Sequence, residues 1–404
     1  MIFIAGFDPQ ETSFLVNRLI ETSSVVFASK RFHYKLSGQL GEKLQDIVPL
    51  HKMFQRLRTL PSSDDAVVLT SGDPLFFGIG RRFLKEFPAE QLAFYPALTT
   101  VQKACARFAL PWDDMDFVSL HGKREKGYQV LIKKILSKSP FKLAIFTDNK
   151  NPPNKIAKRL DEKGLEDARF LVAQDIGGEN EAFWDMSLQE AISRDFHPLN
   201  LLIIKGEHNR NNLGFGQPEN CFYHERGLIT KPEIRSVILS KLRLPDSGVM
   251  WDIGAGSGSV SMEASVISPG LEIFAIEKQQ KRCQHILKNK KKILGLNIEV
   301  ICAEAPECLV NLPRPDRIFI GGGLGSDRLL ETAWRRLGDE GILVTSAILV
   351  ESLQKALAFS KARGRNHELV QITVSHAKDL GQGTYLKPGA CISIFTLCKK
   401  KRAF

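Results

Sequence analysis

The chain has 404 residues, 43% of them hydrophobic, and a formal net charge of +11. It is too long for one hydrophobic core, so two domains are expected. No apolar run approaches the length of a membrane span, and residues 1–7 lack the basic start and long apolar region of a signal peptide, which argues against membranes and favours the cytoplasm. The positive charge fits nucleic acid, an anionic small substrate or a solvated basic surface.

The cysteines favour the same compartment. There are seven, an odd number, and none form a C-x-x-C pair. This usage predicts a reducing environment, without disulfides and without a zinc or other metal site.

Residues 1–206 alternate short apolar runs with helical stretches, which predicts an α/β domain. Residues 207–224 are polar, rich in Gly and Asn and without periodicity, and they are expected to link two domains. The strands expected in the first domain are residues 2–7, 24–29, 66–71, 92–96, 116–120, 142–148, 168–174 and 200–206.

Residues 225–404 form a second α/β unit. Thr230-Lys-Pro-Glu233 has the composition of a capping box and predicts a helix over residues 231–243. The last two of the expected strands lie close together. The strands are residues 249–253, 271–276, 298–302, 317–321, 341–347, 369–376 and 391–398.

A glycine-rich turn follows the first strand of this unit. Gly254, Gly256 and Gly258 allow a tight turn and let a ligand lie against the backbone. A dinucleotide site needs its third glycine at position 259, which is a serine, so the G-x-G-x-G spacing favours another nucleoside. Glu277 lies at the end of the next strand, where a carboxylate can accept both ribose hydroxyls. The alternative is a plain turn between strand and helix.

This turn resembles motif I of the class I S-adenosylmethionine (SAM) methyltransferases. The resemblance implies a Rossmann-like, seven-stranded sheet with an antiparallel last strand. After the strand at 298–302, an acid or small residue of that family meets the adenine ring, which points to Glu304 and Ala305. After the strand at 317–321, Gly321 and Gly322 allow close approach of substrate. The N-P-P-Y, D-P-P-Y and reactive cysteine of many base methyltransferases are absent there, which suits a substrate carbon that is itself electron-rich.

The second half resembles the decarboxylating precorrin methylases of cobalamin biosynthesis. The segments that carry this resemblance are GLITKPEIRSVILSKLRL, WDIGAGSGSVSMEA, AIEK, AEAPECL and IFIGGG. By this resemblance Lys231 and Arg235 face the cleft and bind substrate carboxylates, with Gly322 nearby; in the purely structural interpretation they are exposed helix positions. The SAM contacts implied in this half are Thr230, Gly254, Ala255, Gly256, Ser257, Gly258, Glu277, Glu304 and Ala305.

In the first half, SGDPLFFGIG at 71–80 directly follows a buried strand. Gly72 permits a tight turn, Pro74 fixes φ, and Asp73 can accept hydrogen bonds from nearby amides. Together with YPALTTVQKA, SLHGK and IFTDNKNPPNKIAKRL, this loop resembles the tetrapyrrole (corrin and porphyrin) methylases. That family has two α/β lobes with SAM between them, which implicates Gly72, Asp73, Pro74, Thr99 and Thr100.

Two other features of the first half bear on its activity. His121 is either a proton donor or anion contact, or a structural loop residue. The first strand of the family normally runs into a G-x-G-P-G loop, whereas residues 5–9 here read AGFDP with a single glycine. The substrate-facing loop is therefore shorter or bulkier than in the family.

The two resemblances together imply a fused enzyme with two SAM sites and no metal. It would methylate an anionic tetrapyrrole, precorrin-6B, at carbons 5 and 15 and decarboxylate the ring C acetate. Residues 1–206 would act on carbon 5 and residues 225–404 on carbon 15, in a homo-oligomer that binds neither nucleic acid nor membrane. The alternatives are an RNA methyltransferase, or an active second half carried by a non-catalytic first half.

Overall fold

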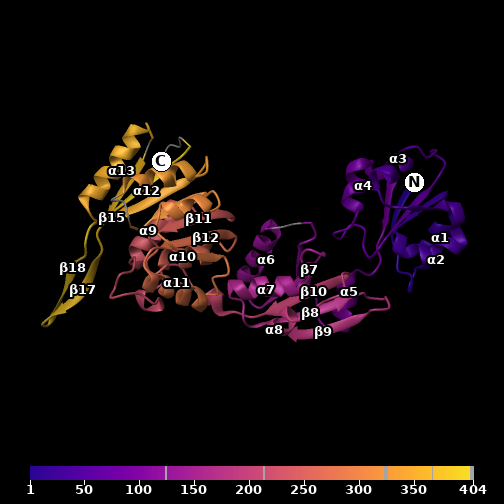
Figure 1. Ribbon diagram of the computed structural model, residues 1–404, viewed down its shortest axis with the longest axis horizontal. Coiled ribbons are helices and arrows are strands. Elements are labelled where there is room, and N and C mark those ends of the chain that lie inside the picture. The colour runs from indigo at the N-terminus through magenta and orange to yellow at the C-terminus, as the bar shows by residue number, and fades with distance from the viewer. Residues whose placement is uncertain (123–124, 213, 323–325, 366, 401–404) are drawn as a thin grey trace.

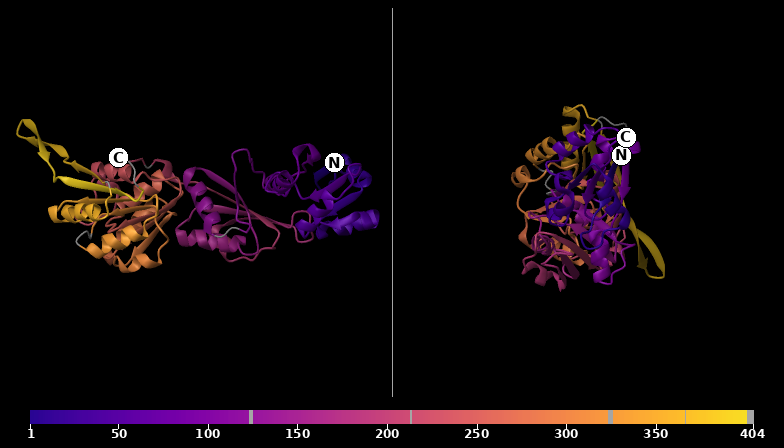
Figure 2. Two further views of the ribbon diagram at one scale, coloured as in Figure 1. Left: turned by 90° about the horizontal axis from the view of Figure 1, so that it is seen from above. Right: turned by 90° about the vertical axis from the view of Figure 1, so that its right-hand side faces the viewer.

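The computed structural model describes residues 1–404 except 123–124, 213, 323–325, 366 and 401–404. Three α/β units follow one another along its long axis (Figure 1), and the view from above shows the same row (Figure 2). Within these described ranges, no helix is both long and apolar enough to cross a bilayer.

The first unit is a parallel five-stranded sheet in the order β3-β2-β4-β1-β5. Neighbouring residues of β4 point to opposite faces, so that Val68 enters one core cluster and Leu69 the other. The elements are β1 (Ile2–Gly6), α1 (Phe14–Thr22), β2 (Val25–Ala28), α2 (Lys30–Leu40), β3 (Leu44–Asp46), α3 (Leu50–Arg58), β4 (Ala66–Thr70), α4 (Gly80–Glu86) and β5 (Leu92–Tyr95).

The second unit is a mixed sheet in the order β6-β7-β10-β8-β9, in which only β6 and β7 run parallel. Helix α7 begins at Pro153, which suits the first helical turn, and it ends at Gly164 with φ of +101°. The elements are α5 (Thr100–Arg107), β6 (Asp116–Ser119), α6 (Glu125–Ser137), β7 (Phe141–Phe146), α7 (Pro153–Lys163), β8 (Ala168–Gln174), β9 (Ala182–Ser187), α8 (Leu188–Ile192) and β10 (Asn200–Gly206).

The third unit is a seven-stranded sheet in the order β13-β12-β11-β14-β15-β19-β16. β19 runs antiparallel to both of its neighbours, as expected for the class I methyltransferase fold. The elements are α9 (Pro232–Leu242), β11 (Gly248–Ile253), α10 (Ser259–Ile267), β12 (Leu271–Glu277), α11 (Gln280–Lys292), β13 (Ile298–Cys302), β14 (Arg317–Ile320), α12 (Asp327–Arg336), β15 (Ile342–Ala347), α13 (Val350–Ala362), β16 (His367–Ile372), β17 (Ser375–Leu380), β18 (Gly383–Pro388) and β19 (Ile392–Cys398).

Strands β17 and β18 form a ribbon that projects from this sheet (Figures 1 and 2). All residues of both strands are exposed, among them Leu380, Tyr385 and Leu386. A two-stranded ribbon with no packed face is marginally stable in water by itself. The ribbon was not predicted, because its sequence carries no apolar alternation.

The described residues between 207 and 224 bond to the units on either side rather than lying loosely extended: His208 bonds to the second unit, and Arg210 and the residues around Gln217 bond to the third. Arg210 is 3% exposed, and its guanidinium donates to the carbonyl oxygens of Ile293 and Leu294 and to the hydroxyl of Ser265. A buried guanidinium needs such acceptors because charge is costly away from water. Arg210 therefore fixes this part of the segment to α10 and to the residues that follow α11.

Candidate functional site

The turn from Gly254 to Gly258 links β11 to α10 at the carboxyl edge of the third sheet. Its three glycines have φ of +71°, +61° and +75°, a region that L side chains rarely adopt. The amides of Gly254 and Ala255 both donate to the carbonyl oxygen of Ile276, at 2.9 and 3.0 Å. The turn is thus tied to the end of β12, where ligands of parallel α/β sheets bind.

Glu277 ends β12 and supports this turn directly. Its Oε2 accepts the Gly256 amide at 2.9 Å, and its Oε1 accepts the Gln279 amide at 3.0 Å. A carboxylate oxygen accepts two hydrogen bonds, so each oxygen keeps one position for a ligand hydroxyl. A Cβ built on Gly256 would meet nothing within 4 Å. Open space therefore lies beside Gly256, whose amide contacts the carboxylate, while the Glu277 side chain itself is buried.

Asp252 is a second acid behind the turn. It is 1% exposed, and its Oδ2 accepts the Ser261 amide at 3.2 Å and the Ser261 hydroxyl at 2.5 Å. Burial raises the pKa of Asp252 from 3.8 to about 6, and the two bonds from Ser261 oppose that rise. Its contacts fasten the start of α10 to the end of β11.

Asn289 also supports the turn, a role that was not predicted from the sequence. Its Nδ2 donates to the carbonyl oxygens of Ser257 and Tyr223, both at 2.9 Å, and its Oδ1 accepts the Tyr223 amide at 2.7 Å. The side chain is 1% exposed. It joins the turn to the segment that precedes the third unit. A single Asn in the lysine-rich helix α11 has the appearance of a surface residue.

The other residues expected at this edge lie around the turn. The Gly321 amide donates to the carbonyl of Ile253, and the missing Cβ of Gly254 would be 3.1 Å from the Gly322 nitrogen. Glu304 is exposed and forms an ion pair with Lys278 at 3.0 Å. Ala305 is half-buried next to it.

An exposed apolar run extends the same edge. Ile348, Leu349 and Val350 follow β15 and are 64–67% exposed. β15 lies two strands from β11, with β14 between them. At about 4.8 Å between neighbouring strands, β15 and β11 lie roughly 10 Å apart, so the run and the glycine turn follow strands close enough to border one bound macrocycle.

In the first half, the expected loop lies between the first two units. Gly72 has φ of +66°, and the Asp73 Oδ1 accepts the Leu75 amide at 2.8 Å. A Cβ on Gly6 would lie 2.1 Å from the Gly72 carbonyl oxygen. The end of β1 and this loop can touch only because Gly6 has no side chain. Pro74 is buried beneath the loop.

Thr99 and Thr100 differ in what their hydroxyls can do. Thr99 caps α5: its hydroxyl accepts the Gln102 amide, while the Gln102 side chain accepts from the Thr99 amide and hydroxyl. That hydroxyl is therefore engaged within the chain. Thr100 is exposed and lines a cavity of about 350 Å³ together with Gly72, Arg31 and Asn200.

Two contacts cross this cavity from the first unit to the second. Asp8 forms an ion pair with Lys103 of α5, and Gln10 Nε2 donates to the Gly177 carbonyl at 3.0 Å. Burial raises the pKa of Asp8, but the hydrogen bonds from Lys103 and the Gln10 amide outweigh it, so that the pKa is lowered. Asp8 is thus held ionised in the place of the expected glycine-rich loop.

His121 lies apart from this cavity. It is exposed beside an open groove of about 690 Å³ that Gly122, Phe77 and Ser119 help to line. Phe77 belongs to the segment that begins at Gly72, so this one loop lines both the cavity and the groove. Among the residues that the structure describes, His121 has no hydrogen-bond partner that would assign it a role.

Comparison with known proteins gives a family for each half. Residues 8–192 match the tetrapyrrole (corrin/porphyrin) methylases, and residues 220–399 match the precorrin methyltransferase domain. A precorrin-6Y C(5,15)-methyltransferase (decarboxylating) from a Sinorhizobium species is 29% identical over 388 residues, which are 95% of this chain and 92% of that protein. A probable cobalt-precorrin-6B C(15)-methyltransferase (decarboxylating) from Pyrobaculum aerophilum is 37% identical over 187 residues, 45% of this chain and 94% of that protein.

The chain belongs to the precorrin C5,15-methyltransferase (decarboxylating) family. It is accordingly a SAM-dependent methyltransferase. A crystal structure of the precorrin-6y C5,15-methyltransferase from Geobacter metallireducens GS-15 is 40% identical, covers 46% of this chain and 97% of that one, and has a TM-score of 0.44.

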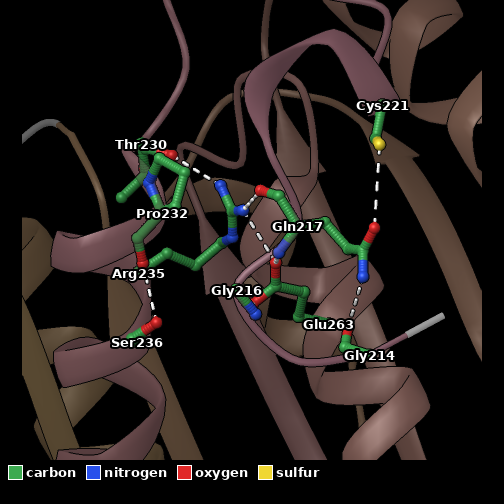
Figure 3. Close-up of polar contacts among 9 residues, drawn as sticks. All are labelled: Gly214, Gly216, Gln217, Cys221, Thr230, Pro232, Arg235, Ser236 and Glu263. Carbon is green, nitrogen blue, oxygen red and sulfur yellow. Dashed lines mark hydrogen bonds and ion pairs between the residues drawn. The ribbon is translucent and has the colours of Figure 1, made fainter.

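Arg235 does not have the role expected of it in this precorrin methyltransferase. Its side chain is fully buried, and its Nη2 lies 2.7 Å from Glu263 Oε1 (Figure 3). Its guanidinium also donates to the carbonyl oxygens of Thr230 and Gln217. Arg235 therefore cannot bind a substrate carboxylate, because every contact is internal. Glu263 in turn accepts the amides of Gly216 and Gln217.

The start of α9 also differs from the prediction. The cap residue is Lys231, with no side-chain cap, and Pro232 takes the first helical position. The expected Thr230–Glu233 capping box is wrong, because Pro232 shifts the helix start by one residue. Thr230 instead offers its carbonyl oxygen to Arg235, and Lys231 pairs with Glu219 at 2.7 Å on the surface.

The cysteines give a further correction. The structure joins Cys283 of α11 to Cys302 at the end of β13 by a disulfide, with 5.9 Å between the Cα atoms. Cys302 is paired in register with Glu277, so the bridge borders the glycine turn. The expectation of no disulfides is wrong, because α11 folds back over the sheet and brings together residues 19 apart. Cysteine usage therefore does not argue for a reducing compartment.

Proposed function

We propose that this chain methylates precorrin-6B at carbons 5 and 15 and decarboxylates the acetate side chain of ring C. The observation that carries the proposal is the coverage of the Sinorhizobium relative. Its name includes both positions and the decarboxylation, and the similarity extends over 95% of this chain. The Pyrobaculum relative, named for carbon 15 and decarboxylation alone, is half as long as this chain. That difference supports a division of the two methyl transfers between halves.

We assign carbon 15 and the decarboxylation to residues 225–404, and carbon 5 to residues 1–206, with 207–224 joining them. SAM, when bound, supplies an electrophilic methyl group on a sulfonium centre. In the second half, the Gly254–Gly258 turn would let the nucleoside lie against its backbone, and the Glu277 carboxylate would accept from the ribose hydroxyls. Gly72, Asp73, Pro74 and Thr100 would do so in the first half.

The chain's contribution to the chemistry is mainly alignment and exclusion of water. The reacting ring carbons are enamine-like, so methyl transfer needs no strong base. Loss of carbon dioxide from the acetate leaves its electron pair in the conjugated ring, which then takes up a proton. The apolar run at Ile348, Leu349 and Val350 supports one face of the macrocycle in this proposal. The net charge of +11 favours capture of an anionic tetrapyrrole.

A calorimetric titration with SAM tests the proposal most directly. Two sites per chain are expected, of which Glu277→Ala removes one and Asp73→Ala the other. Product analysis should show two methyl groups and one carbon dioxide per substrate. A single site, lost in Glu277→Ala, would support the alternative in which the first half is a non-catalytic scaffold. A salt-sensitive gel shift with RNA would revive an RNA substrate.

We further propose a homo-oligomer in which the exposed β17–β18 ribbon pairs with a second copy. The support is the ribbon's lack of any packed face, with Leu380 70% and Leu386 68% exposed. Light scattering of the wild-type chain and of Leu386→Lys should then give different masses. Equal masses would refute the ribbon as the contact.

A further inference from the structure

The two halves meet at the amino edge of the third sheet. Gln129 Nε2 donates to Glu272 at 3.1 Å, and Lys163 lies 3.6 Å from Glu299. Glu272 and Glu299 are the second residues of β12 and β13. The Lys133 ammonium reaches the carbonyl of Asp246, just before β11. Every one of these contacts lies where parallel strands begin.

The glycine turn and Glu277 lie at the other edge. The turn follows the last residue of β11 and Glu277 is the last residue of β12, so the length of these strands separates them from the contact with the first half. β11 has six residues, which at about 3.3 Å each span roughly 20 Å.

The position of the β17–β18 ribbon confirms which edge of the third sheet faces away from the first half. β16 ends and β19 begins at the carboxyl edge, because Ser393 of β19 pairs with Ala347, the last residue of β15. The ribbon between them therefore leaves the sheet at that edge. Figures 1 and 2 show it on the side away from the first half of the chain.

The cavity between the first and second units is likewise separated from the third unit by the length of a strand. Asn200 lines that cavity and begins β10, while Gly206 ends β10 and leads to the third unit. His208 follows, with its ring nitrogen 2.8 Å from the carbonyl of Ile135. The seven residues of β10 thus separate the cavity from the junction, again by roughly 20 Å.

From this geometry we propose that the singly methylated intermediate leaves one site into solvent before it binds the other. The two sites lie on opposite sides of the junction, each about one strand length, roughly 20 Å, away from it. No macrocycle bound in one site reaches the other. This inference rests on the proposed function, which places one methyl transfer in each half. It adds that fusion of the halves does not channel the intermediate.

Complementation between variants tests this directly. Full-length Asp73→Ala and Glu277→Ala are incubated separately and together with SAM and the precorrin substrate. Asp73→Ala should release a decarboxylated, singly methylated tetrapyrrole, and Glu277→Ala should not decarboxylate. The mixture should form the doubly methylated product after a lag, with the intermediate free in solution. Failure of the mixture to complete the reaction would overturn the proposal.

Isotope dilution tests it on the unaltered chain. Wild-type enzyme receives ¹³C-labelled precursor together with an excess of unlabelled intermediate, prepared with Asp73→Ala. A released intermediate mixes with the pool, so label in the final product should fall in proportion to the excess. Undiluted label would show direct transfer, within one chain or between copies. If wild type alone gives no doubly methylated product, the proposed function fails instead, and the two failures are distinct.

Discussion

Glu263→Gln removes the negative charge from the buried pair with Arg235. The two side chains are 2% and 0% exposed and lie 2.7 Å apart. Loss of one partner from a buried pair typically costs about 3–5 kcal/mol because the other charge stays desolvated. Two carbonyl oxygens still accept from Arg235, so we expect the lower end, about 3 kcal/mol, or roughly a hundredfold in the unfolding equilibrium.

Hydrogen exchange with mass spectrometry measures this cost in the second half alone. The slowest amides of β11 and β12 report the opening of that sheet, whereas global unfolding of a two-domain chain mixes both halves. The matched control is Lys231→Met in the same helix region. Its pair with Glu219 is 50% and 34% exposed, and its loss should cost at most about 1 kcal/mol.

The double variant Arg235→Met with Glu263→Gln separates charge from packing. It leaves no buried charge, so the second half should be more stable than in Glu263→Gln alone. If Glu263→Gln costs no more than Lys231→Met, the pair is not what holds residues 214–217 to the sheet, and the reasoning is refuted.

Three further predictions concern the site. Burial raises the pKa of Asp252 from 3.8 to about 6, so its contribution to stability is complete below pH 3.8 and is lost as the pH rises through 6. In denaturation experiments, the free energy of unfolding of wild type relative to Asp252→Asn should therefore fall by about 3 kcal/mol over that pH range. A difference that stays constant with pH would contradict this. Gly256→Val, at φ of +61°, should fill the space beside Glu277 and abolish one SAM site by calorimetry while the other titrates normally. Leu349→Asp should raise the KM for the tetrapyrrole with SAM affinity unchanged, and an unchanged KM would remove the apolar run from the substrate site.

The strands that carry the sites were predictable because they are apolar runs bounded by turn residues. β11, β12 and the glycine turn between them follow from residues 248–277 alone, and the order of the third sheet agrees with the expected fold. The β17–β18 ribbon was missed because both of its faces are exposed, so no period-two pattern marks it. β9 was missed although Trp184 and Met186 alternate with polar residues, since most of the strand is only half-buried.

Side-chain roles were less predictable than strands. Arg235 was expected either as an exposed helix position or as a contact that faces the cleft. Only the position of Glu263, 28 residues later, shows that the side chain is buried in an ion pair instead. Asn289 supports the glycine turn through bonds to Tyr223 and Ser257. Such partners are distant in sequence, and neither periodicity nor spacing relates them. Burial of polar residues depends on the assembled fold.

The packing of residues 207–224 restricts where this chain can be divided. His208 bonds to the second unit through Ile135 and Ser139, whereas the Arg210 guanidinium and the Gln217 amide bond to the third. A fragment that starts at residue 225 would leave Glu263 and Ser265 buried without these donors. The boundary at which both fragments keep their own partners lies at residue 209, well before the Gly254–Gly258 turn. A separate decarboxylating enzyme, whether it arose by gene fission or by engineering, would have to begin there. The residues after 209 that resemble a linker in sequence would then belong to the C-terminal fragment.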